Sequence, residues 1–285
     1  MNLLIGSFVV VASVLGGFMA HGGQLLAIWQ PFEIVIICGA ALGAFVIANP
    51  KAIIFKVGRA IPAILKDGPY GRERYVELLS FMHALFAKMR KEGLIGIEGD
   101  IDEPQDSELF KAYPGVLEDS HALTFIQDYM RLMIGGEMDA FALENLMDIE
   151  LETHHHDIFE PGHAMNRVAD ALPGFGIVAA VLGIVNTMGA LGGPVEEIGA
   201  LVAAALVGSF LGILFAYGFA GPLSTALTKR GEEEAHYFTT IKTCLLASLR
   251  GYAPKVTVEF GRKAIPAALR PRFDELEAEL KSPRA

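Results

Sequence analysis

The sequence has few of the features on which soluble enzymes and disulfide-rich proteins depend. Its 285 residues include two cysteines, Cys38 and Cys244, which suggest neither a disulfide framework nor a CxxC metal site. No stretch of any length alternates strictly between apolar and polar residues, so β-strands are not predicted. Nucleophile-elbow, glycine-rich phosphate-loop and HExxH motifs are also missing. A soluble-domain enzyme is therefore a poor interpretation of this chain.

Charge is missing from several long apolar runs. The segment 171–228 holds two such runs, and its only charged residues, Glu196 and Glu197, lie in the turn that joins them. A charged side chain at the centre of a bilayer costs roughly 2.5 to 3.5 kcal/mol on insertion scales, so this segment is predicted to be a transmembrane hairpin. Leu3–Ala20 and Ile34–Asn49 are two further runs of nearly spanning length. The chain is predicted to be an all-α integral membrane protein with four transmembrane helices.

Basic residues are absent from the two short links within the pairs of spans, HGGQLLAIWQPFE and GGPVEEIG. They gather at the opposite ends of the spans: Lys51, Lys56, Arg59, Lys66, Arg72, Arg74, Arg167, Lys229 and Arg230. Since cytoplasmic flanks carry an excess of Lys and Arg, both termini and the middle segment are predicted to face the cytoplasm. The predicted order is transmembrane helices 1 and 2 (1–50), a cytoplasmic helical domain (51–170), transmembrane helices 3 and 4 (171–228) and a cytoplasmic helical tail (229–285).

The segments outside the spans are predicted to be helical and polar. Apolar residues recur with helical spacing in YVELLSFMHALFAKMRKEG and HALTFIQDYMRLMIGG, with Gly93 and Gly135–Gly136 as natural helix ends. The stretch EPQDSELFKAYPG is interpreted as a polar connection between helices. The net charge of −10 comes largely from these segments. It argues against general attraction to nucleic acid or anionic lipid and favours a polar protein partner.

No ionisable residue is expected deep within a span, although ion-coupled proteins normally carry one. Glu33 begins the second span and Asp170 precedes the third, so both are predicted near a membrane surface. If protons cross here, another polypeptide must supply the carboxylate that binds them. The spans do contain two GxxxG pairs, which let helices approach closely: Gly39 with Gly43, and Gly208 with Gly212.

Pro173 and Pro222 lie toward the predicted cytoplasmic ends of the third and fourth spans. A proline within a helix removes one backbone hydrogen bond and produces a kink that can act as a hinge. The alternatives are that Pro173 merely starts a helix and that the GxxxG pairs are simple packing. The adjacent histidines His154–His156 beside Asp157 point to different faces of a helix, which favours a solvated face over a metal site.

Two strings carry a resemblance to a known family. PGFGIVAAVLGIVNTMGAL, from Pro173 to Leu191, and ALVGSFLGILFAYGFAGPLSTAL, from Ala205 to Leu227, resemble the third and fourth spans of MotA flagellar stator subunits, in the MotA/TolQ/ExbB proton channel superfamily. The four-span plan with a large cytoplasmic insert is similar as well. The resemblance implies a proton-driven stator subunit in the bacterial inner membrane, working without a cofactor. It also implies a ring of five copies around the single spans of two copies of MotB, which supplies the proton-binding aspartate.

The resemblance implies roles along the proton path for six residues, namely Pro173, Ala180, Leu206, Ser209, Tyr217 and Pro222. The two prolines match those that couple proton passage to conformational change, and Ser209 and Tyr217 match polar positions near the path. Leu206 stands where some members have methionine. Sodium-driven relatives have threonine where this chain has Ala180, and alanine offers no hydroxyl oxygen to a hard cation, so protons are the expected ion.

For the middle segment, the resemblance implies that Arg90, Glu98 and, more weakly, Glu150 meet the rotor protein FliG. The residues alone indicate only a solvated helix surface. The rival interpretation is an ExbB- or TolQ-type energiser of outer-membrane processes, which shares the ring around a partner but usually has three spans. A small-molecule transporter is less favoured, because the sequence shows neither an internal repeat nor a polar site within the spans.

Overall fold

The computed structural model describes residues 2–66, 68–136 and 138–281, and these residues form helices and no β-strand. The predicted all-helical class is confirmed. The chain groups into two compact units, unit 1 (Met1–Asp67 and Ile158–Arg230) and unit 2 (Gly68–Asp157 and Gly231–Ala285). The predicted middle and tail segments mostly form unit 2, but the parts of them nearest the spans belong to unit 1. Residues 282–285 of the predicted tail lie outside the described residues.

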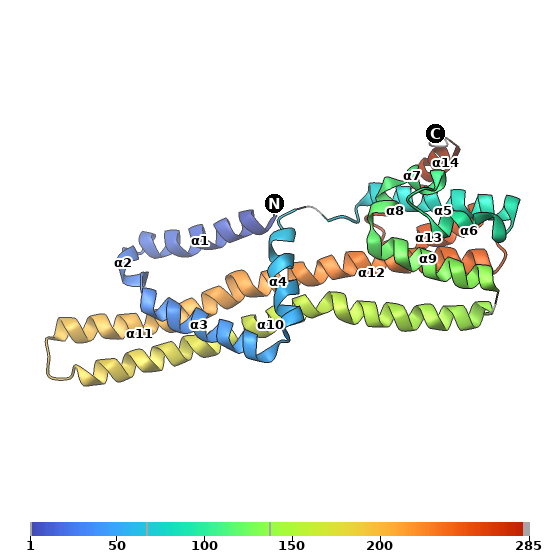
Figure 1. Cartoon of the computed structure of the whole chain (residues 1–285). Coiled ribbons are helices and arrows are strands. Elements are labelled where there is room, and N and C mark those ends of the chain that lie inside the picture. The colour runs from blue at the N-terminus through green and yellow to red at the C-terminus, as the bar shows by residue number, and fades with distance from the viewer. Residues whose placement is uncertain (1, 67, 137, 282–285) are drawn as a thin grey trace. The chain divides into compact units, whose positions relative to one another are not determined.

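Unit 1 contains the apolar spans (Figure 1). Its complete helices are α1 (Asn2–Ala20), α2 (Leu25–Ile28), α3 (Pro31–Ala48), α4 (Lys51–Ala63), α11 (Val195–Phe215) and the π-helix η2 (Ala216–Ala220). It also contains α10 (Ala140–Gly189) from Ile158 onward and α12 (Gly221–Leu249) as far as Arg230. By length and composition, four helical segments can cross a membrane, and they are Leu3–Ala20, Leu25–Ala48, Ala140–Gly189 and Val195–Leu249. The four predicted spans are thus confirmed among the described residues.

The core of unit 1 lies where α3, α10 and α11 meet. α3 packs against α11, and Ile37 and Ala41 of α3 are buried in one apolar cluster with Leu172 and Ala179 of α10 and Leu211 of α11. The two alanines, Ala41 and Ala179, are short side chains that let the helices approach closely. At the end of α3, Arg167 donates to Asn49 Oδ1 at 2.8 Å and fixes α3 to α10.

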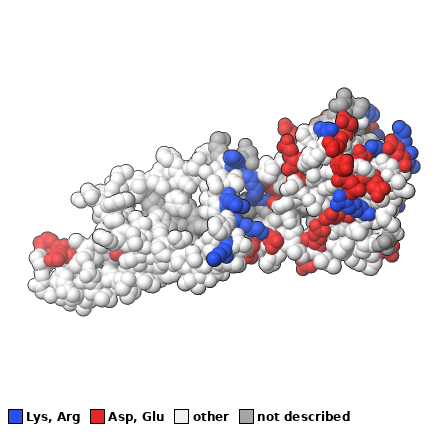
Figure 2. Space-filling model, viewed as in Figure 1, with Lys and Arg blue, Asp and Glu red and all other residues white. Residues whose placement is uncertain are grey.

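Helix α4 is amphipathic, as expected of a helix lying at a membrane surface. Val57 is buried, whereas Lys51, Lys56 and Arg59 are exposed. Arg230 donates to the carbonyls of Ala63 and Lys66, at 3.1 and 2.9 Å, and so supplies donors to the backbone at and just after the end of α4. In Figure 2 the apolar part of unit 1 is almost uncoloured, and Lys and Arg gather at the end where α4 lies.

Unit 2 is a helical bundle with its own core. It comprises α5 (Arg72–Glu92), the 3₁₀-helix η1 (Ile95–Ile97), α6 (Glu98–Asp102), α7 (Glu108–Lys111), α8 (Pro114–Glu118), α9 (Ser120–Gly135), the first part of α10, the last part of α12, α13 (Pro254–Ala264) and α14 (Phe273–Lys281). α5 packs closely on α13. Gly93 and Gly136 end α5 and α9 at φ +81° and +67°, as predicted from their positions.

The prediction of a purely polar connection around Pro104 and Pro114 is wrong. This stretch folds into the short helices α7 and α8, and Phe110 is fully buried against Phe81 at a ring distance of 4.7 Å. Ser107 caps α7 by accepting from the Phe110 backbone N–H at 3.3 Å. Helices of four or five residues leave no periodic pattern in a sequence, which is why they were not predicted.

Candidate functional site

The seam between α10 and α11 is built from glycines. A Cβ atom on Gly212 would lie 2.7 Å from Gly176 Cα and 2.8 Å from the Leu172 carbonyl oxygen, and one on Gly208 would lie 3.1 Å from Ala179 Cβ. The predicted packing residues Gly208 and Gly212 therefore contact α10 directly, with Gly176 as a partner that the GxxxG pattern does not mark. The other two glycines differ, since a Cβ on Gly39 or on Gly43 would meet no atom within 4 Å.

The proton-path residues predicted from the resemblance lie along two stripes of helix surface. On α10, Pro173 and Ala180 share a stripe with Ile177, which is 60% exposed. On α11 and η2, three residues at helical spacing form the second stripe, and they are Leu206 (65% exposed), Ser209 and Tyr217 (74% exposed). We call these the α10 stripe and the α11 stripe. Both stripes are largely uncovered within this chain, so they are available to a partner.

Pro222 lies two residues after the end of η2, and the π-helix has a direct cause. Proline has no N–H, and its ring collides with the carbonyl four residues earlier, here that of Gly218. The backbone therefore forms the wider π-helix η2 over Ala216–Ala220 before α12 begins. Pro173 also lies within a helix, inside α10, so the alternative in which it starts a helix is wrong.

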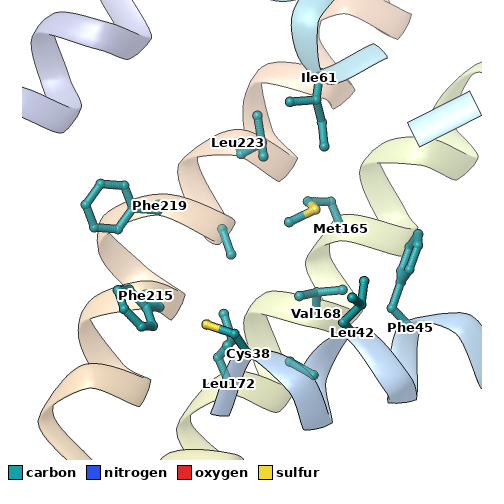
Figure 3. A pocket seen from close by; sticks show the side chains of 12 residues that line it. Cys38, Leu42, Phe45, Ile61, Met165, Val168, Leu172, Phe215, Phe219 and Leu223 are labelled. Atoms are coloured by element: carbon teal, nitrogen blue, oxygen red, sulfur yellow. The ribbon is translucent and has the colours of Figure 1, made fainter. Parts of the chain in front are cut away.

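An apolar cavity of about 480 Å³ lies beside η2. Figure 3 shows Phe215, Phe219 and Leu223 on one side of it and Met165 and Val168 of α10 on another. The remaining labelled residues complete the lining, namely Cys38, Leu42, Phe45, Ile61 and Leu172. Space of this kind next to a widened helix lets side chains rearrange without colliding with a packed core.

Glu33 makes a contact that the sequence did not reveal. Its backbone lies in the first turn of α3, and its side chain as a whole is half-buried. Oε2 is buried, has no hydrogen-bond partner among the described residues, and lies 3.1 Å from the Cβ position of Gly208. The same position on Gly208 is 3.2 Å from the Ala180 backbone nitrogen. Ala180 is roughly 14 Å along α10 from its end at Gly189, at 1.5 Å per residue.

In unit 2, Arg90 and Glu98 stand on either side of one short connection. Arg90 is in the last turn of α5 and Glu98 begins α6, and both are exposed with no ion pair to another described residue. Between them, Ile95 is 80% exposed. The nearby Lys88 is instead held by Asp100, with 2.5 Å between Nζ and Oδ2.

Glu150 is placed differently from the other two predicted rotor-contact residues. It is exposed on α10, but its Oε2 accepts a hydrogen bond of 2.6 Å from the Tyr129 hydroxyl. Burial, with this bond second, raises the pKa of Tyr129 above its ordinary value. Glu150 therefore stabilises the contact between α9 and α10, whatever else it meets.

The histidine cluster is divided between two environments. His154 Nε2 lies 3.2 Å from Glu234 Oε1, and its ring packs at 4.5 Å from that of Phe238, while His155 and His156 are exposed. Among the described residues, no group of three or more His, Cys, Asp or Glu side chains is arranged to hold a metal ion.

Other titratable groups of unit 2 serve its stability. Arg262 donates to both carboxylate oxygens of Glu259, at 2.6 and 2.7 Å, and to the Pro271 carbonyl at 3.0 Å. The first of these contacts holds the pKa of Glu259 below its usual range. Burial raises the pKa of the Cys244 thiol to about 12, so this cysteine is an inert core residue.

Known families match both halves of the chain. The model described as Motility protein A N-terminal matches residues 4–93, and that of the MotA/TolQ/ExbB proton channel family matches residues 118–240. The chain is 44% identical to Motility protein A of Salmonella typhimurium, over 100% of this chain and 96% of that protein. It is also 44% identical to Motility protein A of Escherichia coli, over 99% and 96%. Chemotaxis protein LafT of Vibrio parahaemolyticus is 37% identical, over 97% of each chain.

Two solved structures share the fold. A chain of the C. jejuni MotAB structure superposes with a TM-score of 0.75 and 18% identity, covering 94% of this chain and 97% of that one. A chain of the flagellar MotAB stator complex from Bacillus subtilis gives a TM-score of 0.71 and 23% identity, covering 93% and 96%. At these identities the agreement concerns the fold alone, and it extends over nearly the whole chain.

Proposed function

Since the chain belongs to the motility protein A family of flagellar stator subunits, we propose that it forms a proton-conducting complex with MotB and turns proton flow into torque on the rotor. The observation that carries this proposal is the 44% identity to Motility protein A over the full chain, which includes the spans and unit 2 alike. The ExbB- or TolQ-type alternative is not favoured, because the relatives matched over the full length are motility proteins and the chain has four candidate spans.

The partner's place follows from the two stripes. Exposed apolar residues within a span must face lipid or another helix, and the α10 and α11 stripes hold the residues that the family resemblance assigns to the proton path. A MotB span lying against these stripes would bring its aspartate to Ala180, Ser209 and Tyr217. A ring of copies, five by the resemblance, would surround the two MotB spans with identical stripes.

Protons can supply energy on the scale that a hinge requires. A proton crossing ~150 mV releases about 3.5 kcal/mol, at ~2.3 kcal/mol per charge per 100 mV. That energy shifts a packed structure from one arrangement to another only if the two arrangements differ in free energy by a similar amount. Three features of unit 1 would allow two packed arrangements of similar free energy, and they are the glycine contacts between α10 and α11, the π-helix before Pro222 and the cavity beside it. Protonation of the MotB aspartate would bias the hinge, and α10 and α12 would carry the change into unit 2.

The rotor-facing surface is proposed to centre on the connection between α5 and α6. An exposed Ile95 flanked by the unpaired charges of Arg90 and Glu98 combines an apolar anchor with a polar rim, the usual composition of a contact surface. Opposite charges on FliG would then set the orientation of the contact. With this assignment both termini and unit 2 lie in the cytoplasm, and the protein is a multi-pass protein of the inner membrane.

Deleting the gene tests the function directly. Cells lacking the chain should carry complete filaments but fail to swim, and supplying the gene should restore swimming. A complementing Pro173→Leu gene should give normal membrane levels of the protein with severe loss of motility. Non-flagellated cells would indicate a role in filament assembly instead, and defects confined to the outer membrane would favour the ExbB- or TolQ-type function.

A further inference from the structure

Glu33 is an unexplained charge in the membrane part of the protein. Its Oε2 atom is buried and unpartnered, although an acid within an apolar span normally pairs with a cation or a hydrogen-bond donor. The Cβ position of Gly208 in α11 lies 3.1 Å from this atom and also 3.1 Å from Ala179 Cβ of α10, so the carboxylate reaches the place where the two helices meet. Neither stability nor packing accounts for a carboxylate at this place, because an apolar side chain of similar size would avoid the cost of burial.

No other charge in the neighbourhood can neutralise Glu33. The elements packed around it contain no Asp, Glu, Lys, Arg or His within their membrane portions, which are Ala171–Gly189 of α10, Ile198–Phe215 of α11 and the remainder of α3. The nearest acids in sequence on α11, Glu196 and Glu197, lie in its first turn. These membrane portions therefore offer no cationic side chain to the carboxylate, and a mobile proton is the positive charge that can reach it.

The position of Glu33 coincides with the proposed proton path. Ala180, whose backbone nitrogen lies by the same Gly208 position, belongs to the α10 stripe, and Ser209 of the α11 stripe follows Gly208 directly. The side chain thus enters the α10–α11 seam from α3 beside the two stripes. The glycine at position 208 leaves room for it, because a Cβ there would stand 3.1 Å from Oε2, closer than most Cβ contacts.

We propose that Glu33 is a second proton-binding carboxylate of the path, carried by this chain itself and acting before the MotB aspartate. A hydrated proton arriving from outside protonates Glu33, which becomes neutral, and the proton then leaves along water toward the partner's aspartate and restores the carboxylate. No covalent bond other than O–H is made or broken, and each cycle moves one positive charge inward. The inference rests on the proposed function.

Proton flux into vesicles that contain the complete complex with MotB tests the proposal. Glu33→Gln keeps the size of the side chain, but the amide cannot take up and release a proton at the pH values of the measurement. We expect flux at least about tenfold below that of the native complex, because proton transfer by a positioned group contributes that much or more. The flux should also lose its dependence on outer pH, while Glu33→Asp should restore part of both.

Two controls separate this role from a structural one. Glu197→Gln, at an exposed acid in the first turn of α11, should leave flux and pH profile unchanged. The melting temperature and subunit content of the Glu33→Gln complex should match those of the native complex, since no described group bonds to Oε2. A Glu33→Gln complex with native flux and an unaltered pH profile would overturn the inference. If the native complex itself conducts no protons, the proposed function fails instead.

Discussion

Single glycines decide where the spans of unit 1 touch. The sequence marks two GxxxG pairs that look equivalent, yet within this chain only Gly208 and Gly212 lie against another helix. The difference depends on which face of each helix is turned inward, and a run of apolar residues on all sides does not reveal that. For the same reason the sequence showed Glu33 at the start of a span but not that its carboxylate lies beside Gly208 of α11.

Substitution of Gly212 by valine should weaken the α10–α11 seam. Its Cβ would meet Gly176 Cα and the Leu172 carbonyl at distances that real contacts do not allow, and overpacking of this kind costs about 1 to 3 kcal/mol. Thermal unfolding of the detergent-solubilised chain without MotB should show a lower melting temperature. Gly43→Val is the matched control and should leave the melting temperature unchanged. Equal losses for both variants would contradict the assignment of the seam.

Arg262→Lys should destabilise unit 2 although the charge is kept. Lysine cannot make the two parallel bonds to Glu259 and also reach the Pro271 carbonyl, so about 1 to 3 kcal/mol of unfolding free energy should be lost. Denaturant unfolding followed by circular dichroism measures the loss. Lys263→Arg, on the exposed neighbouring position, should have little effect.

Among the helical elements, those with a long periodic pattern were predictable and the irregular ones were not. The spans, α5 and α9 follow from apolar length or helical spacing, and Gly93 and Gly136 end two of them because glycine tolerates a positive φ. The continuity of α10 through Pro161 and Pro173 and the π-helix before Pro222 depend on tertiary packing around each proline. The sequence marked Pro173 and Pro222 as candidate hinges without showing which backbone geometry each would produce.

Pro222→Ala should remove the cause of η2. An N–H at position 222 could bond the Gly218 carbonyl, so a regular α-helix would replace the widened turn. We expect normal membrane insertion, an equal or higher melting temperature and severe loss of swimming speed. Pro254→Ala is the control, because Pro254 stands in the first turn of α13, where no N–H is needed, and cells carrying it should swim normally.

For the molecule as a whole, acid should destabilise unit 2 through His83. Burial, and then the nearby Lys255, lower the pKa of His83 in the folded state. Below the unfolded pKa of about 6.5, the unfolded chain therefore binds a proton that the folded chain does not. Stability should fall as the pH drops from about 6.5 toward the lower folded pKa, and be unaffected by this group above that range.

Melting temperatures of the solubilised protein between pH 7.5 and 5.5 measure this effect. Replacing His83 by glutamine should reduce the decrease of the melting temperature on acidification. His155→Gln, at an exposed position, should leave that decrease as in the native protein. A native and a His83→Gln protein with the same slope would show that another group is responsible.

The surface of unit 2 between α5 and α6 gives a prediction about the working motor. Arg90→Glu should weaken the proposed rotor contact by on the order of 1 kcal/mol through like-charge repulsion, and lower torque at high load. A charge reversal on FliG should partly restore torque, and torque from tethered cells is the measurement. Glu152→Lys, another exposed reversal in unit 2, should have no such effect. If no FliG reversal compensates Arg90→Glu, the side chain is merely solvated.

The bonds from Arg230 to the carbonyls of Ala63 and Lys66 bear on how the protein is made. During synthesis the ribosome releases Ala63 and Lys66 long before Arg230, whose own appearance requires that the last hydrophobic segment has already been translated. Until then the Ala63 carbonyl accepts, among the described residues, only from the Lys66 backbone N–H, at 3.1 Å, and the end of α4 is not yet bonded to α12. The end of α4 thus gains its last contacts only after the final span is made, and a truncated product that ends before residue 230 would leave it unattached for the quality-control proteases to recognise.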